Sequence, residues 1–202
     1  MPKLISEQFI IVRHNLLEIP EYNAEIAHVR KVLNIPLEEI SPRFFFDQYA
    51  FVVICSYWKE QYARKEWEAF LKTDDVQEIS NTRKREAVYI GISRYEDWFK
   101  ELLKAPDKLE YLDSLPMIGE VTRCHLARNI GIDCVKPDRH LVRLAMAHGY
   151  FSPPLNPCKL SVLDQWDGCT RMCQDIQEDI GSNEKLGTID VILWRACNLG
   201  WL

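Results

Sequence analysis

The sequence lacks the features that would place it among membrane, secreted or fibrous proteins. It has no run of about 18 apolar residues, the minimum length of a membrane-spanning helix. The N-terminal residues Met1-Pro2-Lys3-Leu4 do not begin a secretory signal, in which a basic segment precedes an apolar one. Internal repeats and low-complexity tracts are also missing. We therefore expect a globular protein of the cytoplasm, associated with the nucleoid, or of the nucleus, without a membrane partner.

The seven cysteines lack the short spacings of most structural metal sites. In the C-terminal part only Cys169 and Cys173 are close, and their spacing is also that of one helical turn. An odd number of scattered cysteines is typical of reduced thiols in a reducing compartment. A metal-dependent hydrolase that uses these two cysteines with nearby histidines or aspartates is an alternative.

Positive charge is in deficit, with 25 lysines and arginines against 30 aspartates and glutamates and a net charge of −5. This balance argues against nucleic-acid binding, because most of that affinity comes from neutralising phosphates. The distribution of charge matters more than its sum, however, and between residues 123 and 143 the balance reverses. The basic residues of that stretch are Arg123, Arg128, Lys136, Arg139 and Arg143. We expect a locally basic face, with an acidic helical protein-interaction scaffold as an alternative.

Alternation typical of strands is rare, and apolar residues recur three and four positions apart. The pattern predicts an all-α protein with about ten helices, an estimate from the positions of helix breakers. Helices are expected over 23–33, from 42 through 71, and over 80–89, 96–103, 106–112, 120–130, 138–148, 160–180 and 187–194. Thr188 is the expected N-cap of the last helix, and the proline-rich stretch 152–157 is the best linker candidate.

A short turn, Leu115-Pro116-Met117-Ile118-Gly119, separates two of these helical patterns. Such a turn exposes the free N–H groups of the second helix, which together with the helix dipole form an anion site. Gly119 would let a phosphate approach the backbone without a Cβ in the way. Taken alone, this pattern is as compatible with an ordinary corner between helices as with a helix-hairpin-helix DNA anchor.

An aspartate with a special position comes after the turn, in Lys136-Pro137-Asp138-Arg139-His140. Pro137 cannot extend the preceding helix, so Asp138 is placed at the start of the next one. A carboxylate there caps the helix and is held rigidly by backbone N–H groups. One residue can therefore serve both as an N-cap and as a catalytic group.

Together these motifs resemble those of the helix-hairpin-helix DNA glycosylase superfamily, which includes endonuclease III, the adenine glycosylase of mismatch repair and the 8-oxoguanine glycosylases. The resemblance covers roughly residues 41 to 145. Val53 to Trp58 resembles the family's segment near the flipped base, and Ile189 to Trp194 resembles the end of the compact 8-oxoguanine glycosylases, which lack an iron–sulfur cluster. The residues that match the hairpin and the aspartate segment are Leu115, Pro116, Ile118, Gly119, Asp138, His140 and Arg143.

The resemblance implies an all-α fold of two helical lobes with a cleft between them. Residues 41–137 would form a central lobe that contains the hairpin. Residues 1–40 and 138–202 would form a second lobe from both termini. The implied cofactor is at most a structural Na⁺ or K⁺ held by the main-chain carbonyls of Asp113, Leu115 and Ile118, without an iron–sulfur cluster.

The resemblance also implies roles for individual residues. Asp138 would be the catalytic carboxylate. Ser56, Tyr57 and Trp58 would form the base pocket and wedge, with Trp58 helping to fill the hole that the extruded base leaves. The implied DNA contacts are Met117, Gly119, Val121, Thr122, Arg123, Arg139 and His140.

The implied activity is removal of a damaged or modified base from double-stranded DNA by a monomeric enzyme. Val121 stands where bifunctional members carry a lysine, and a valine cannot form a Schiff base, so base removal without strand cleavage is expected. Lys136 is a weaker candidate for a substitute amine nucleophile. Met117 replaces the first hairpin glycine and must reach the same turn with a Cβ present. A helix-hairpin-helix protein that binds DNA without catalysis is the alternative.

Overall fold

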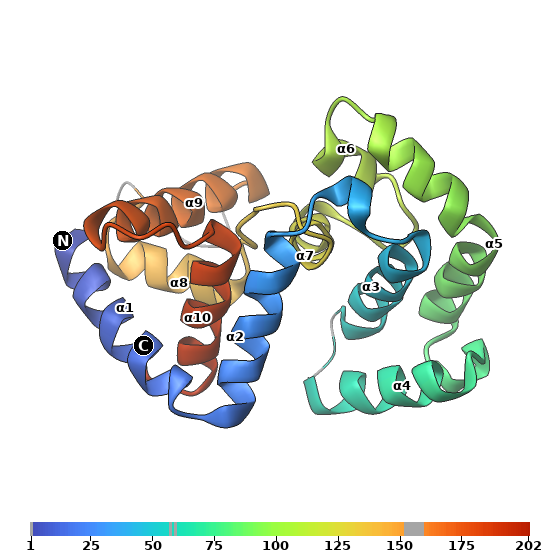
Figure 1. Ribbon diagram of the computed structural model, residues 1–202, viewed down its shortest axis with the longest axis horizontal. Coiled ribbons are helices and arrows are strands. Elements are labelled where there is room, and N and C mark those ends of the chain that lie inside the picture. Colours follow the sequence, from blue (N-terminus) through green and yellow to red (C-terminus); the bar gives the residue numbers. More distant parts are fainter. Residues whose placement is uncertain (1, 57, 59, 152–159) are drawn as a thin grey trace. The chain divides into compact units, whose positions relative to one another are not determined.

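The computed structural model describes residues 2–56, 58, 60–151 and 160–202. These residues contain ten α-helices, two short 3₁₀ helices and no strand, as the all-α prediction required (Figure 1). No helix among them has the length and apolar character needed to cross a membrane. The chain divides into two compact units. We call Met1–Ile35 with Gly131–Leu202 the terminal unit, and Pro36–Ile130 the central unit; the expected lobes placed the boundaries after residues 40 and 137.

The terminal unit is built around its last helix, α10, which packs against the unit's four other helices. Nine of the residues in α10 are buried, including Asp190 and Arg195. A helix that is buried on all sides belongs in a core, and the aliphatic side chains around it come from every other helix of the unit. The helices of the terminal unit are α1 (Pro2–Leu17), α2 (Pro20–Leu33), α8 (Arg139–Ala147), α9 (Val162–Asp179) and α10 (Leu186–Asn198).

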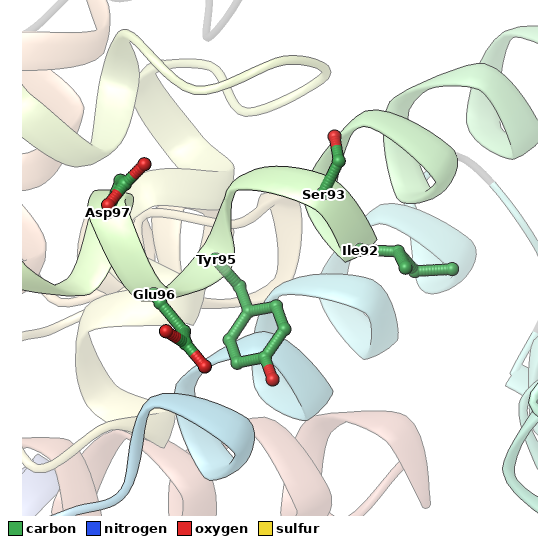
Figure 2. Close-up of a pocket in the computed structure, with 5 residues that line it drawn as sticks. All are labelled: Ile92, Ser93, Tyr95, Glu96 and Asp97. Carbon is green, nitrogen blue, oxygen red and sulfur yellow. The ribbon is translucent and has the colours of Figure 1, made fainter.

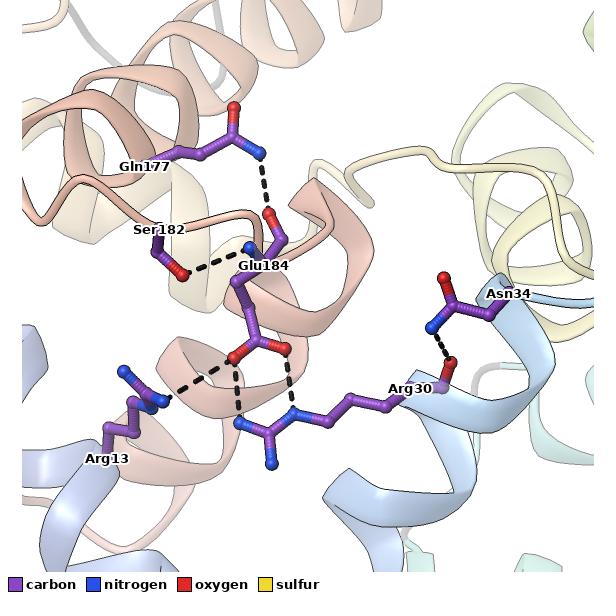
Figure 3. Close-up of polar contacts among 6 residues, drawn as sticks. All are labelled: Arg13, Arg30, Asn34, Gln177, Ser182 and Glu184. Carbon is purple, nitrogen blue, oxygen red and sulfur yellow. Dashed lines mark hydrogen bonds and ion pairs between the residues drawn. The ribbon is translucent and has the colours of Figure 1, made fainter.

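A half-buried carboxylate links three segments of the terminal unit (Figure 3). Glu184, which lies between α9 and α10, receives two hydrogen bonds of 2.7 Å from the guanidinium of Arg30 on α2. Arg13 on α1 lies 3.9 Å from the same carboxylate, and the Glu184 N–H donates to Ser182 Oγ. Because a fork-shaped guanidinium matches both carboxylate oxygens, this cluster fixes the turn that precedes α10.

The central unit is held together by aromatic side chains between α3 and α5. Tyr49 and Trp98 pack edge to face with ring centroids 5.3 Å apart. Gly91 lies in the middle of α5, where a Cβ would come within 2.9 Å of the Tyr49 ring, so glycine permits the close approach of the two helices. The unit contains α3 (Pro42–Cys55), α4 (Glu60–Thr73), α5 (Thr82–Lys104), α6 (Lys108–Asp113), α7 (Glu120–Asn129) and the 3₁₀ helices Leu37–Glu39 and Val76–Glu78.

Several predicted helix limits need correction. The helices expected over 80–89 and 96–103 are one helix, α5, which continues through Gly91, where it packs closely on α3. The long pattern from 42 through 71 is two helices, α3 and α4. Thr188 is not an N-cap: α10 begins earlier, after Lys185, and Thr188 is buried inside it. The linker candidate 152–157 lies outside the described residues.

Candidate nucleic-acid interface and active site

The predicted hairpin connects α6 to α7 and is anchored to the core of the central unit. Leu115 and Ile118 are buried, and the Ile118 N–H donates to the Leu115 carbonyl at 3.1 Å. The hydroxyl of Tyr49 lies 2.9 Å from the Pro116 carbonyl and 3.2 Å from that of Ala87. Burial raises the pKa of Tyr49 well above its ordinary value, so the phenol stays protonated and remains a donor. The contact with Tyr49 and the burial of Leu115 and Ile118 therefore fix the shape of the hairpin.

Met117, at the tip of the hairpin, has a left-handed backbone with φ of +62°. Among the described non-glycine residues only Asp74 shares this region. An L-residue held there costs roughly 1–2 kcal/mol, and the Met117 side chain is exposed. The chain thus keeps, with a methionine, a backbone conformation that favours glycine.

Gly119 has the opposite character, because nothing among the described residues requires a glycine there. Its φ of −139° and ψ of 179° are extended and open to any residue. A Cβ built on it meets no atom within 4 Å. Gly119 offers α7 no side-chain cap, while its own N–H donates to Thr122 Oγ1 at 2.8 Å. Val121 lies in the first turn of α7, and its N–H faces no capping side chain.

The carbonyls expected to hold a monovalent cation surround the same turn. Those of Asp113 and Ile118 accept no hydrogen bond from the described residues, and that of Leu115 accepts one, from Ile118. A carbonyl oxygen has two lone pairs, so all three are compatible with a Na⁺ or K⁺ ligand role. Arg123 on α7 lies 3.7 Å from the Asp113 carboxylate, which ties the two helices of the hairpin together.

Asp138 is the N-cap of α8 in the terminal unit, as predicted from Pro137. Its Oδ1 accepts the N–H groups of His140 at 2.9 Å and of Leu141 at 3.1 Å. Its other oxygen, Oδ2, accepts no hydrogen bond from the part of the chain that the structure describes. The side chain is half-buried. One oxygen therefore fixes the carboxylate, and the other is available to a ligand.

Two carboxylates, Asp133 and Asp190, hold the segment that leads to Asp138. Asp190, 1% exposed on α10, accepts the Lys136 N–H at 2.9 Å. Asp133 accepts the Gly187 N–H at 2.8 Å. In the first bond the segment donates to α10, and in the second α10 donates to the segment. The first turns of α10 therefore determine where Asp138 lies.

The side chains close to Asp138 include two thiols. Burial, then the carboxylates of Asp190 and Asp138, raises the pKa of Cys169. Burial raises the pKa of Cys197 to about 11, and Asp138 adds to that rise. Over the described residues no group of three or more histidines, cysteines, aspartates or glutamates is arranged to hold a metal ion. Cys169 and Cys173 are buried neighbours on α9.

The predicted base pocket and wedge lie at the end of α3, in the central unit. Ser56 is buried as the C-cap of α3, and its hydroxyl donates to the Val53 carbonyl at 2.7 Å. Trp58 is half-buried, and the ammonium of Lys84 lies 4.7 Å from the centroid of its ring. Tyr57 lies outside the described residues. Lys84 is a neighbour that the sequence did not reveal, because it is distant along the chain.

The remaining predicted residues lie near the start of α8. Arg139 is exposed, and its Nε lies 3.4 Å from Nε2 of His140. The Lys136 backbone is held by Asp190.

A hollow of about 290 Å³ on α5 includes none of the predicted site residues (Figure 2). The structure thus groups the hairpin residues, Ser56 and Trp58 in the central unit, and Lys136, Asp138, Arg139 and His140 in the terminal unit.

This all-helical chain, with its hairpin and its N-capping aspartate, has the fold of the helix-hairpin-helix DNA glycosylases. One match is the crystal structure of the Methanocaldococcus jannaschii 8-oxoguanine glycosylase/lyase in complex with DNA containing 8-oxoguanine. It has a TM-score of 0.71 and 15% identity and covers 98% of both chains. The 8-oxoguanine DNA glycosylase of Thermotoga maritima matches with a TM-score of 0.69 and 16% identity over 96% of both chains. No family model and no curated protein matches the sequence. The predicted all-α fold is confirmed.

Proposed function

We propose that this protein is a DNA glycosylase that extrudes a damaged or modified base from duplex DNA and hydrolyses its N-glycosidic bond. The observation that carries the proposal is the likeness of nearly the whole chain to a glycosylase/lyase solved on DNA containing 8-oxoguanine. Two features of the chain itself support it: a hairpin with an open glycine, and a fixed carboxylate with one free oxygen.

In this proposal Asp138 acts on the sugar of the extruded nucleotide. Breaking the bond between C1′ and the base leaves positive charge on the sugar, and a carboxylate held in place stabilises that charge. The base leaves with the electron pair of the broken bond and takes up a proton. The oxygen of a water molecule bonds to C1′ and that water gives up one proton, so the base and the sugar together gain one molecule of water. Oδ2 of Asp138 orients the water while Oδ1 remains on the backbone of α8.

The hairpin supplies DNA binding that does not depend on sequence. The amides of Gly119 and Val121 hold a phosphate, and the open space at Gly119 lets it approach. The Thr122 hydroxyl, which now accepts the Gly119 N–H, turns aside when that N–H binds DNA. The carbonyls of Asp113, Leu115 and Ile118 would hold a Na⁺ or K⁺, which would supply positive charge for binding DNA. No other cofactor is required.

The proposed enzyme removes the base without cutting the strand, because Val121 occupies the position of the lysine in bifunctional members. Borohydride traps a Schiff base between an enzyme amine and the sugar, so the parent protein is expected to give no trapped complex. The variant Val121→Lys is expected to give one. If the parent is trapped and Lys136→Gln abolishes trapping, Lys136 is the nucleophile and the monofunctional proposal is wrong.

The substrate is identified by base release. Duplexes that carry single oxidised, alkylated, deaminated or mispaired bases are incubated with the purified protein, and freed bases are detected by mass spectrometry. We expect 8-oxoguanine among the released bases, since both matching structures are 8-oxoguanine glycosylases. Salt-dependent DNA binding without release of any base would instead support the non-catalytic helix-hairpin-helix protein.

A further inference from the structure

Lys84 is a buried cation that neither the hairpin nor Asp138 explains. It lies in the first turn of α5, where its N–H donates to the N-cap Asn81, and it is 2% exposed. Its ammonium donates to the carbonyls of Ile54 at 2.7 Å and Ser56 at 2.6 Å. These are carbonyls at the C-terminal end of α3, which lack partners within the helix. The side chain therefore joins the start of α5 to the end of α3.

The third contact of the ammonium is aromatic. Nζ lies 4.7 Å from the centroid of the Trp58 ring, within the range in which a cation is attracted to a ring face. Burial lowers the pKa of Lys84, whereas the Glu66 carboxylate opposes that effect. The negative end of the α3 dipole also favours the charged form. The geometry thus places a positive charge against one ring face of a half-buried tryptophan.

These contacts leave Lys84 little freedom for other roles. An ammonium has three N–H donors; two are committed to carbonyls, and the ring takes the remaining direction. A side chain that is 2% exposed does not reach a DNA phosphate or the sugar of an extruded nucleotide. Lys84 instead contacts both the end of α3 and the ring of Trp58.

We propose that Lys84 is a positioning residue that fixes the Trp58 ring in the orientation needed to fill the space left by an extruded base. This inference rests on the proposed function and on the wedge role that the resemblance implies for Trp58, and it adds a residue to both. Selective binding of damaged DNA, but not binding of DNA in general, then depends on Lys84.

The test compares Lys84→Met with a matched control, Lys108→Met. Lys108 also places its ammonium on two helix-end carbonyls, those of Leu103 at 2.8 Å and Ala105 at 2.7 Å, without a tryptophan ring. Affinity is measured for a duplex with 8-oxoguanine opposite cytosine and for its undamaged counterpart, each with 2-aminopurine beside the target position to report unstacking. We expect Lys84→Met to reduce the preference for the damaged duplex about fivefold, and Lys108→Met to leave it unchanged.

The salt dependence of binding distinguishes positioning from direct contact. Because Lys84 neutralises no phosphate, Lys84→Met should leave both the affinity for undamaged DNA and its salt slope unchanged, whereas loss of a phosphate contact lowers that slope by about one. Trp58→Phe should reproduce the fivefold loss, and adding Lys84→Met to it should cause no further loss. Lys84→Arg, which keeps the charge, should restore part of the preference.

The inference is overturned if Lys84→Met keeps its preference for damaged DNA, or if it loses affinity for both duplexes with a shallower salt slope. Should that variant fail to fold, the parent protein labelled with 5-fluorotryptophan decides. The ¹⁹F resonance that disappears in Trp58→Phe must shift more with damaged than with undamaged DNA, and an equal shift refutes the inference. A parent protein that neither binds DNA nor releases a base refutes the proposed function itself.

Discussion

The hairpin before α7 and the turn before α8 both position a functional group, but the groups are of different kinds. Each places a functional group at the start of a helix directly after a break in the chain. Before α8 the group is a side chain, Asp138, which is bound by two backbone N–H groups. Before α7 the proposed groups are backbone N–H donors, and Gly119 leaves them without a side-chain cap.

This difference determines which substitutions each turn tolerates. A function carried by backbone atoms depends on chain shape and open space, so Met117 can stand in for a glycine as long as it adopts a positive φ. A function carried by a carboxylate depends on the identity of one residue. Substitutions in the two turns should therefore separate stability, DNA affinity and catalysis from one another.

The largest effect is expected at Asp138. Asparagine also caps helices well, so Asp138→Asn should cost less than about 1 kcal/mol of stability, but it removes the charge that stabilises the sugar. We expect the rate of base release to fall at least about a hundredfold with little change in DNA affinity. Asp107→Asn is the matched control, because Asp107 caps α6 in the same way, through the N–H of Glu110. Equal rates for Asp138→Asn and the parent would contradict the proposed mechanism.

The second effect concerns DNA affinity and the open space at Gly119. Its extended backbone accepts alanine, and the added Cβ meets no described atom in the free protein, so stability should change by less than about 0.5 kcal/mol. The methyl group would hold a phosphate away from the α7 amides. Loss of one hydrogen bond to a charged group, about 1.5 kcal/mol, lowers affinity about tenfold.

The measurement is a titration of Gly119→Ala with damaged and undamaged duplexes. Both affinities should fall by the same factor, because a phosphate contact does not read the base. An affinity within twofold of the parent's for both duplexes would show that the hairpin is not the proposed anchor.

Helix ends could be predicted from the sequence wherever local chemistry determines them. Ser41 caps α3 through the N–H of Phe44, and Gly131 and Gly149 have positive φ directly after the helices expected over 120–130 and 138–148. Asp138 belongs to this group, because Pro137 forces the break and the carboxylate then caps α8. These signals act within a few residues, so one sequence is enough to reveal them.

The contacts that orient the candidate site come from distant parts of the chain. Tyr49 supports the hairpin carbonyl of Pro116, and Asp190 holds the backbone of Lys136. Each side chain reads as an ordinary core or cap residue until the fold brings its partner near. Gly91 shows the same limit: a glycine within a helical pattern suggests a break, whereas here it marks close packing of α5 on α3. Helix α1 was not predicted at all.

The third effect is a gain in stability at Met117. Replacing it with glycine removes roughly 1–2 kcal/mol of left-handed strain, offset by about 0.5–1 kcal/mol from the greater freedom of glycine in the unfolded chain. We expect Met117→Gly to raise the free energy of unfolding in urea by about 0.5–1 kcal/mol. Gly181→Ala is the reverse change, because Gly181 has a φ of +57° and open space for a Cβ. It should lower the free energy of unfolding by a similar amount. A loss on Met117→Gly would mean that the methionine side chain stabilises the hairpin.

The smallest effect is expected at the other left-handed non-glycine residue, Asp74. Its carboxylate lies 2.7 Å from Arg43 Nη2, but the two side chains are 59% and 47% exposed, and such ion pairs contribute about 0.5 kcal/mol or less. Asparagine tolerates the same backbone, so Asp74→Asn should cost no more than that. The hydrogen bond from Arg43 lowers the pKa of Asp74, so the contribution is present above the pKa of the unfolded chain and disappears as the pH falls through that of the folded protein. The free energy of unfolding in urea should therefore be slightly lower for the variant than for the parent at pH 7, and this difference should shrink at pH 2.5. A difference that grows in acid would show that Asp74 acts through something other than its charge.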